Sequence, residues 1–368
     1  MSEQNPKNQW QSSKMRERLA KGLVAATLSV LLTPVAFLLN ARSEAGIFLD
    51  DQPACAQVIP QTPASTPLPL DGDDALAYYN RGNNYYDVAD YLAAIADFDR
   101  AIELDPEYVS AYLVRGAAYY QMEQYESAIA DYDRALELDP EDAFAYTNRG
   151  AAYLELQDYD VAIADFDRAI VLDSEDARSY YGRGIVYYGL EDYEAAIAEF
   201  DNAIELNPEY VDAYVDRGNS YATLGEFERG IDDRDQAIAL DPNCTRAYFN
   251  RGLTYETLGD LEQAVADYGR AIALDPDDIE IYLARGRVYG KVGFYQLAVS
   301  DFDDAIALDP TNAEAYWGRG VARFYLEQYE AGVADFREYE ALTGQLEPFM
   351  EDAINAVEAF LDDGGNGN

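Results

Sequence analysis

Arginine and acidic residues recur at a fixed spacing along this chain and are its most regular candidates for polar chemistry. An arginine stands every 34 residues from residue 81 to residue 319, and an acidic residue follows each one 16 positions later. Because a guanidinium can hold a carboxylate through two parallel hydrogen bonds, this predicts one ion pair per period, within or between periods, that fixes packing register. The other hypothesis, a ladder that reads phosphates or acidic peptides, fits poorly with the surrounding negative charge. The arginines are Arg81, Arg115, Arg149, Arg183, Arg217, Arg251, Arg285 and Arg319, and the acids are Asp97, Asp131, Asp165, Glu199, Asp233, Asp267, Asp301 and Asp335.

Residues suited to catalysis or metal binding are scarce. The chain has no histidine and two cysteines, Cys55 and Cys244. It therefore lacks the usual general base and the commonest metal ligand, and two distant thiols cannot form a disulfide framework or a four-thiolate zinc site. We predict no enzyme, no catalytic residues, no cofactor and no metal site. We expect Cys244 to be a solvent-facing spare thiol in a loop.

The charge of the chain restricts its partners. The 368 residues include 26 basic and 70 acidic side chains, which give a formal net charge of −44. Such a surface should repel nucleic acid and anionic lipid and attract cationic partners. The same charge is also typical of a protein that is kept soluble or is adapted to a salty medium.

An apolar segment near the N-terminus predicts export. Residues 1–21 form a basic region, and residues 22–39 contain no charged side chain. The length of the apolar segment lies between that of a signal-peptide core and that of a membrane span. The basic flank should stay in the cytoplasm, so the remainder should lie on the non-cytoplasmic side, either membrane-anchored or, after cleavage, secreted or periplasmic. The proline-rich residues 40–74 should form a linker.

A strict period then extends over residues 75–346. When the recurrent glycine is numbered position 8, position 11 is mostly tyrosine, position 20 is small, position 24 is mostly aromatic and position 32 is mostly proline. Positions 4, 8 and 11 share one face of a first helix, and positions 20, 24 and 27 share one face of a second. Asp-Pro at positions 31 and 32 should stop the second helix and cap the next one. The glycines, which let the two backbones approach, are Gly82, Gly116, Gly150, Gly184, Gly218, Gly252, Gly286 and Gly320.

One such hairpin cannot bury both of its faces, but stacked hairpins can. The pattern resembles the tetratricopeptide repeat (TPR), which implies an all-α, right-handed α-solenoid of eight TPR helix hairpins. The chain departs from the family in having Tyr for Trp at position 4, Arg for Leu at position 7 and Arg234 for an aromatic residue at position 24. A C-terminal capping helix should cover residues 347–363, before a disordered tail at 364–368. The predicted units are 75–108, 109–142, 143–176, 177–210, 211–244, 245–278, 279–312 and 313–346.

The resemblance also implies that the first helices line a concave groove. Exposed rings beside Asn amides suit a bound peptide, because rings supply contact area at low entropic cost and amides bond its backbone. The alternative is that these tyrosines complete the packing of adjacent hairpins. The candidate partner-binding residues are Tyr79, Asn80, Asn83, Tyr86, Asp87, Leu113, Tyr120, Asn148, Tyr181, Tyr188, Asp216, Asn219, Phe249, Asn250, Glu256, Trp317 and Phe324.

These features together predict a non-catalytic protein–protein interaction scaffold or adaptor. It should be exported and should bind a protein or peptide segment, basic or aromatic-rich, in the groove. Lysines that clamp a carboxylate tail in some family members are missing at position 5. We expect no nucleic acid partner, and membrane contact only through residues 22–39 if they are retained. The competing hypothesis is a structural envelope element that self-associates, and the sequence leaves the oligomeric state open.

Overall fold

The computed structural model describes residues 74–364. This range contains 17 helices and no strand, so the predicted all-α class is confirmed. The described residues belong to two compact units, 74–244 and 245–364. The predictions for the basic region, the apolar segment, the linker up to residue 73 and the tail after residue 364 lie outside the described range.

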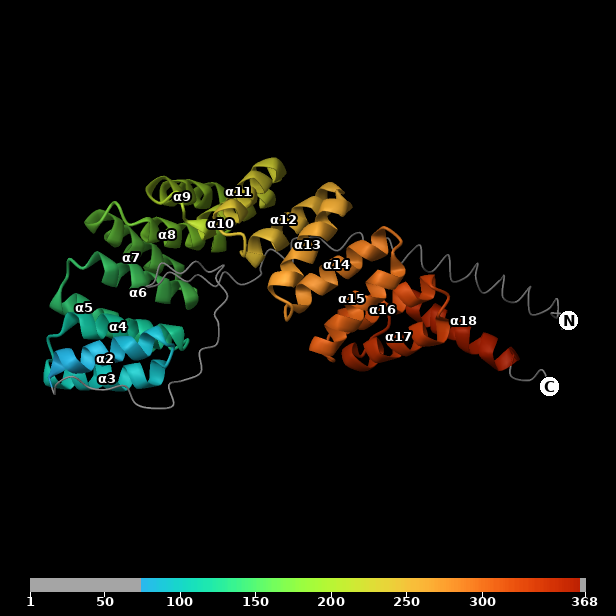
Figure 1. Ribbon diagram of the computed structural model, residues 1–368, viewed down its shortest axis with the longest axis horizontal. Helices are drawn as coiled ribbons and strands as arrows, with labels where there is room; N and C mark the ends of the chain where they lie inside the picture. The colour runs from blue at the N-terminus through green and yellow to red at the C-terminus, as the bar shows by residue number, and fades with distance from the viewer. Residues whose placement is uncertain (1–73, 365–368) are drawn as a thin grey trace. The chain divides into compact units, whose positions relative to one another are not determined.

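Residues 74–244 contain five helix hairpins. In each hairpin an even-numbered first helix packs against the odd-numbered second helix that follows it, and that second helix packs against the next first helix. Within this unit the helices lie next to one another in chain order (Figure 1). Their bounds are α2 Ala75–Asp87, α3 Tyr91–Leu104, α4 Val109–Gln121, α5 Tyr125–Leu138, α6 Ala143–Glu155, α7 Tyr159–Leu172, α8 Ala177–Gly189, α9 Tyr193–Leu206, α10 Val211–Thr223 and α11 Phe227–Leu240.

Residues 245–364 contain three more hairpins and a final helix. The final helix, α18, closes the apolar face that the last hairpin leaves open. Its Met350, Ile354 and Val357 are 0%, 1% and 2% exposed and pack with Phe324 and Phe336. The helices are α12 Thr245–Leu258, α13 Leu261–Leu274, α14 Ile279–Lys291, α15 Tyr295–Leu308, α16 Ala313–Tyr325, α17 Tyr329–Thr343 and α18 Pro348–Gly364.

The recurrent glycine is required where the two helices of a hairpin meet. A Cβ atom built on Gly150 would lie 3.1 Å from Cε1 of Phe166 and 3.3 Å from the backbone oxygen of Ala162. Both distances are shorter than ordinary van der Waals contacts, and Ala162 and Phe166 have no exposed surface. The glycine therefore lets the helix backbones approach while the ring at position 24 fills the space beside them.

The ends of the helices correct one prediction. Asp139, at position 31, does not cap the next helix: its backbone N–H donates to the carbonyl oxygen of Ala135, and its carboxylate accepts a hydrogen bond of 3.1 Å from the N–H of Glu141. The cap is Asp142, at position 34, which accepts a hydrogen bond of 3.0 Å from the N–H of Ala145. The turn between hairpins is thus longer than predicted, and its proline precedes the helix.

Cys244 corrects a second prediction. Its side chain has no exposed surface and is disulfide-bonded, so it is not a solvent-facing spare thiol. Cys244 follows α11, and its backbone N–H donates to the carbonyl oxygen of Asp241 at 3.1 Å. This turn points the small side chain inward, a packing that loop position alone does not predict.

Candidate partner-binding surface

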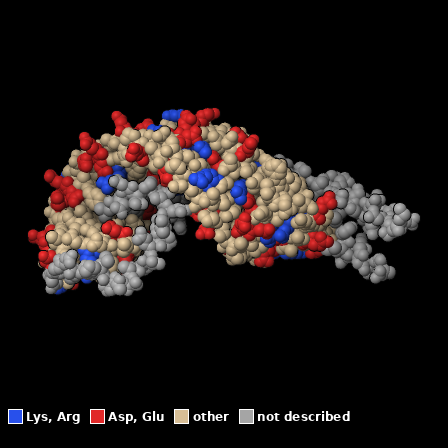
Figure 2. All heavy atoms as spheres, viewed as in Figure 1, with Lys and Arg blue, Asp and Glu red and all other residues tan. Residues whose placement is uncertain are grey.

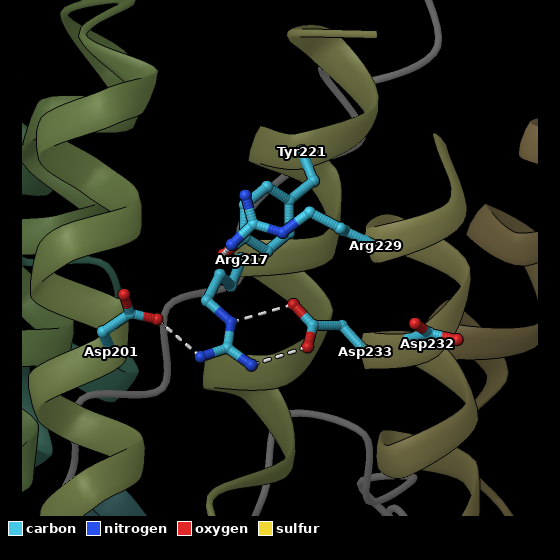
Figure 3. Close-up of a pocket in the computed structure, with 6 residues that line it drawn as sticks. All are labelled: Asp201, Arg217, Tyr221, Arg229, Asp232 and Asp233. Atoms are coloured by element: carbon cyan, nitrogen blue, oxygen red, sulfur yellow. Dashed lines mark hydrogen bonds and ion pairs between the residues drawn. The ribbon is translucent and has the colours of Figure 1, made fainter. Parts of the chain in front are cut away.

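The recurrent arginines form an ion-pair ladder through the described part of both units. Figure 3 shows Arg217 of α10 between Asp233 of α11 and Asp201 of α9. Arg217 Nε and Nη2 donate to the two carboxylate oxygens of Asp233 at 2.9 and 2.6 Å, and Nη1 donates to Asp201 at 2.6 Å. The predicted pair within each repeat is present for all eight described arginines, at 2.6–2.8 Å.

Sequence reasoning missed the second carboxylate, at position 25 of the preceding repeat. This contact joins Arg115, Arg149, Arg183, Arg217 and Arg319 to such a carboxylate, at 2.5–2.6 Å. The signal was available, because position 25 is Asp in six repeats. One guanidinium therefore joins the helices of its own hairpin and also joins that hairpin to its neighbour.

Burial acts on both charges of the pair between Arg115 and Asp131. Burial opposes the charge on Arg115, but its hydrogen bonds to Asp131 and Asp99 outweigh this and raise the pKa of the guanidinium. Burial also raises the pKa of Asp131, and the hydrogen bonds from Arg115 reduce that rise. These guanidiniums are occupied by carboxylates of the chain itself, so the ladder serves packing rather than recognition of phosphate.

The two family departures at positions 4 and 7 occur together. The guanidinium carbon of Arg149 lies 5.4 Å from the ring centroid of Tyr146, three residues earlier on the same helix. The same contact occurs in six other repeats. A tyrosine ring thus covers one face of the cation while carboxylates hold its edge, a favourable cation–π arrangement.

The structure places the predicted groove residues in three environments. Asn80 and Asp87 are exposed, while Tyr79, Asn83, Leu113, Tyr188, Glu256 and Trp317 are partly exposed. The expectation of exposed side chains is wrong for the rest, which are at most 9% exposed. Some are covered by the second helix of their own hairpin, as Phe324 is by Phe336, and others by the next first helix, as Tyr181 is by Asp216. The buried residues are Tyr86, Tyr120, Asn148, Tyr181, Asp216, Asn219, Phe249, Asn250 and Phe324.

Several buried residues join neighbouring first helices. The hydroxyl of Tyr181 donates to Asp216 at 2.7 Å, and the hydroxyl of Tyr120 donates to Glu155 at 3.0 Å. Each bond joins one repeat to the next. For Tyr120 and Tyr181 the alternative hypothesis therefore holds, because these rings complete the packing of adjacent hairpins.

Repeat five buries a polar cluster where other repeats have a ring. Arg234 is 0% exposed and donates to Asn219 at 2.9 Å, and Asn219 donates to Asp216 at 3.3 Å. Burial, followed by the charge of Asp216, raises the pKa of the nearby Tyr188 to about 12. The sequence marked Arg234 as a departure but did not predict a buried cation. Its signal was Gly230, since a Cβ there would lie 2.9 Å from Nη1 of Arg234.

Four family models, described as tetratricopeptide repeat or TPR repeat, match residues 82–123, 116–157, 149–217, 211–244, 257–293 and 283–346. The chain is a tetratricopeptide repeat protein. The fold of this tetratricopeptide repeat protein is that of protein-interaction scaffolds. A search of curated proteins gave no match.

Several solved structures share this fold at low sequence identity. The crystal structure of the APC/C hetero-tetramer Cut9–Hcn1 is 15% identical over 76% of this chain, with a TM-score of 0.54. This chain covers 55% of the matched chain, about half of its length. Yeast Tom70 is 20% identical, with 83% of this chain and 68% of that chain covered and a TM-score of 0.53. PilF of Pseudomonas aeruginosa is 20% identical, with 56% and 94% covered and a TM-score of 0.51. These identities establish a common fold alone.

Between residues 74 and 364, none of the helices combines the length and apolarity that a bilayer crossing requires. The apolar segment at 22–39 lies outside this range.

Proposed function

We propose that this protein is an exported, non-catalytic scaffold that binds a segment of a partner protein along its first helices. The observation that carries the proposal is the set of exposed and partly exposed side chains on the first helices of residues 74–244. Tyr79, Asn80, Asn83, Leu113 and Tyr188 combine rings with amides, which suit a peptide backbone and its side chains.

The surface charge supports a basic or aromatic-rich partner. Acidic side chains are spread over the visible face and outnumber basic ones (Figure 2). The formal net charge of −44 attracts cationic segments and speeds their encounter at low salt. The ion-pair ladder adds no free basic surface, because its arginines are paired.

Two observations support export. The basic residues 1–21 precede an uncharged apolar segment at 22–39, the arrangement of a signal or anchor. Cys244 is disulfide-bonded, and structural disulfides persist mainly in oxidising compartments. Fractionation of cells followed by N-terminal sequencing of the mature protein tests this point. An intact N-terminus in the soluble cytoplasmic fraction would contradict export.

Affinity capture from an envelope extract tests binding along the first helices. The test variant carries Tyr79→Ala and Tyr188→Ala, and it leaves the buried Tyr86 and Tyr181 in place because their loss would disturb packing. The control carries Leu92→Ala and Val171→Ala, whose side chains are 70% and 74% exposed on second helices α3 and α7. We expect a partner that the wild type and the control retain and the test variant loses.

Two results would contradict the proposal. Equal capture of the partner by the test variant and the control would show that the binding site does not include Tyr79 or Tyr188. Capture of further copies of the chain alone would favour a self-associating envelope element.

A further inference from the structure

The turn between α14 and α15, in repeat seven, differs in chemistry from the other turns of the described chain. Its Phe294 and Val292 side chains are 59% and 40% exposed, and Leu297, in the first turn of α15, is 48% exposed. No acidic residue lies between positions 281 and 300, which is the longest acid-free run in the range 74–364. At the position of Phe294 the other repeats have Asp90, Gln124, Asp158, Asp192, Glu226, Asp260 and Gln328.

Phe294 is apolar at a position that is polar in the other seven repeats and that caps the second helix in three of them. In repeat four the equivalent Asp192 accepts a hydrogen bond of 3.1 Å from the N–H of Ala195, which caps α9. Phe294 stands at the same place before α15 and provides no side-chain cap. Its ring meets Tyr289 edge-on, with centroids 6.4 Å apart, and remains mostly in solvent. A large ring that stays mostly in solvent, at a position that is polar in every other repeat, indicates a binding role.

The neighbouring turns add one apolar side chain and a border of acids. Lys291 binds Glu256 at 2.6 Å, and this contact places the end of α14 beside the end of α12, where Leu258 is 47% exposed. The ring of Tyr295 stacks on Tyr325 at 4.3 Å, so the end of α16 lies on the other side. Leu258, Val292, Phe294 and Leu297 together are here named the repeat-seven patch.

The border of the patch is acidic on both sides. Asp260 and Glu262 follow Leu258 in repeat six, and Glu327 and Glu330 occupy the corresponding turn of repeat eight. All four carboxylates are exposed. An occupant should therefore present apolar side chains at its centre and positive charge at both ends.

We propose that the repeat-seven patch docks an apolar segment of a partner protein that carries lysine or arginine on both sides. Its residues belong to 245–364 and differ from the first-helix residues of 74–244 on which the proposed function rests. Anionic membrane is a poor occupant, because the acidic border would repel it.

Fluorescence anisotropy with the full chain and a synthetic peptide tests the assignment. The probe peptide places Leu-Phe-Leu-Leu between two pairs of lysines. One matched peptide replaces the lysines by glutamates, and another replaces the apolar residues by serines. We expect the probe to bind at least about tenfold more tightly than either matched peptide, and its affinity to fall as salt is raised.

Phe294→Asp separates binding from folding. It restores the cap found at Asp192 and removes the most exposed ring, so the variant should melt no lower than the wild type while its affinity for the probe falls at least about tenfold. Leu297→Ala, which keeps Phe294, should weaken binding in the same direction. Leu92→Ala on α3 should bind as the wild type does.

Three outcomes would overturn the proposal. Unchanged affinity in both Phe294→Asp and Leu297→Ala would place the peptide elsewhere on the chain. Equal binding of the glutamate peptide would show that the acidic border does not select a basic partner. Binding to vesicles of anionic phospholipid that Phe294→Asp abolishes would make the patch a membrane contact instead.

Discussion

Gly269 marks a missing ion pair whose restoration should stabilise the protein. It occupies position 25 of repeat six, where six repeats have Asp. Arg319 of repeat eight binds Asp335 of its own repeat at 2.7 Å. It also binds Asp303, the position-25 residue of repeat seven, at 2.5 Å. Arg285 binds Asp301 at 2.8 Å, and its Nη1 would lie 3.6 Å from a Cβ built on Gly269. Gly269→Asp should therefore add a contact between α13 and α14 without a clash.

The size of the gain follows from exposure and backbone entropy. The side chain of Asp303 is 49% exposed, so the restored pair is screened and contributes about 0.2–1 kcal/mol. Replacing glycine by aspartate inside a helix adds about 0.3 kcal/mol. Together they should raise the free energy of unfolding of residues 245–364 by roughly 0.5–1.3 kcal/mol.

Gly269→Asn is the matched control, because it makes a similar backbone change without a charge. Urea unfolding, with hydrogen exchange of the α13 and α14 amides as a local measure, should rank Asp above Asn by about 0.2–1 kcal/mol at low salt. Salt should reduce this difference. Equal stability of the two variants at low salt would refute the view that position-25 carboxylates join neighbouring repeats.

Three further predictions concern packing, pH and salt. Gly150→Leu should destabilise the protein by roughly 1–3 kcal/mol or more in a melting experiment. Gly290→Leu should destabilise it less, because a Cβ added there meets nothing within 4 Å. Equal destabilisation by the two substitutions would contradict the close helix contact at Gly150. Because burial raises the pKa of Tyr188 from 10.0 to about 12, its share of stability is complete below pH 10 and is lost as the pH rises through 12. Tyr188→Phe, which has no ionisable hydroxyl, should therefore lose less helical circular dichroism than the wild type as the pH rises from 10 to 12, and identical pH profiles of the two proteins would contradict this. Finally, the charge of −44 should make the melting temperature rise between about 0.01 and about 1 M NaCl, and a falling temperature would mean that the ion pairs outweigh the net repulsion.

The 34-residue period predicted the fold because every repeat places the same small and aromatic residues where its two helices meet. The contact between Gly150 and Phe166 follows from their spacing on two helices, and so does the pairing of Arg149 with Asp165 at 2.7 Å. Every such contact lies within one hairpin, where local geometry determines which side chains meet.

Contacts between hairpins were harder to predict. Whether Tyr181 is exposed depends on how closely the next first helix approaches, and the sequence does not give that distance. The buried cluster at Arg234 combines residues from both helices of one repeat with Tyr181 of the preceding one, so no single period contains its pattern. The inward turn at Cys244 likewise depends on tertiary packing rather than on loop position.

Site-specific photo-crosslinking in living cells tests the scaffold function most directly. A photoreactive amino acid would replace Tyr79 or Tyr188 on first helices, and Leu92 or Val171 on second helices as controls. Our account predicts that Tyr79 and Tyr188 give adducts with the same partner protein and that the two controls do not. Adducts from the second helices alone, or adducts only with further copies of this chain, would contradict it.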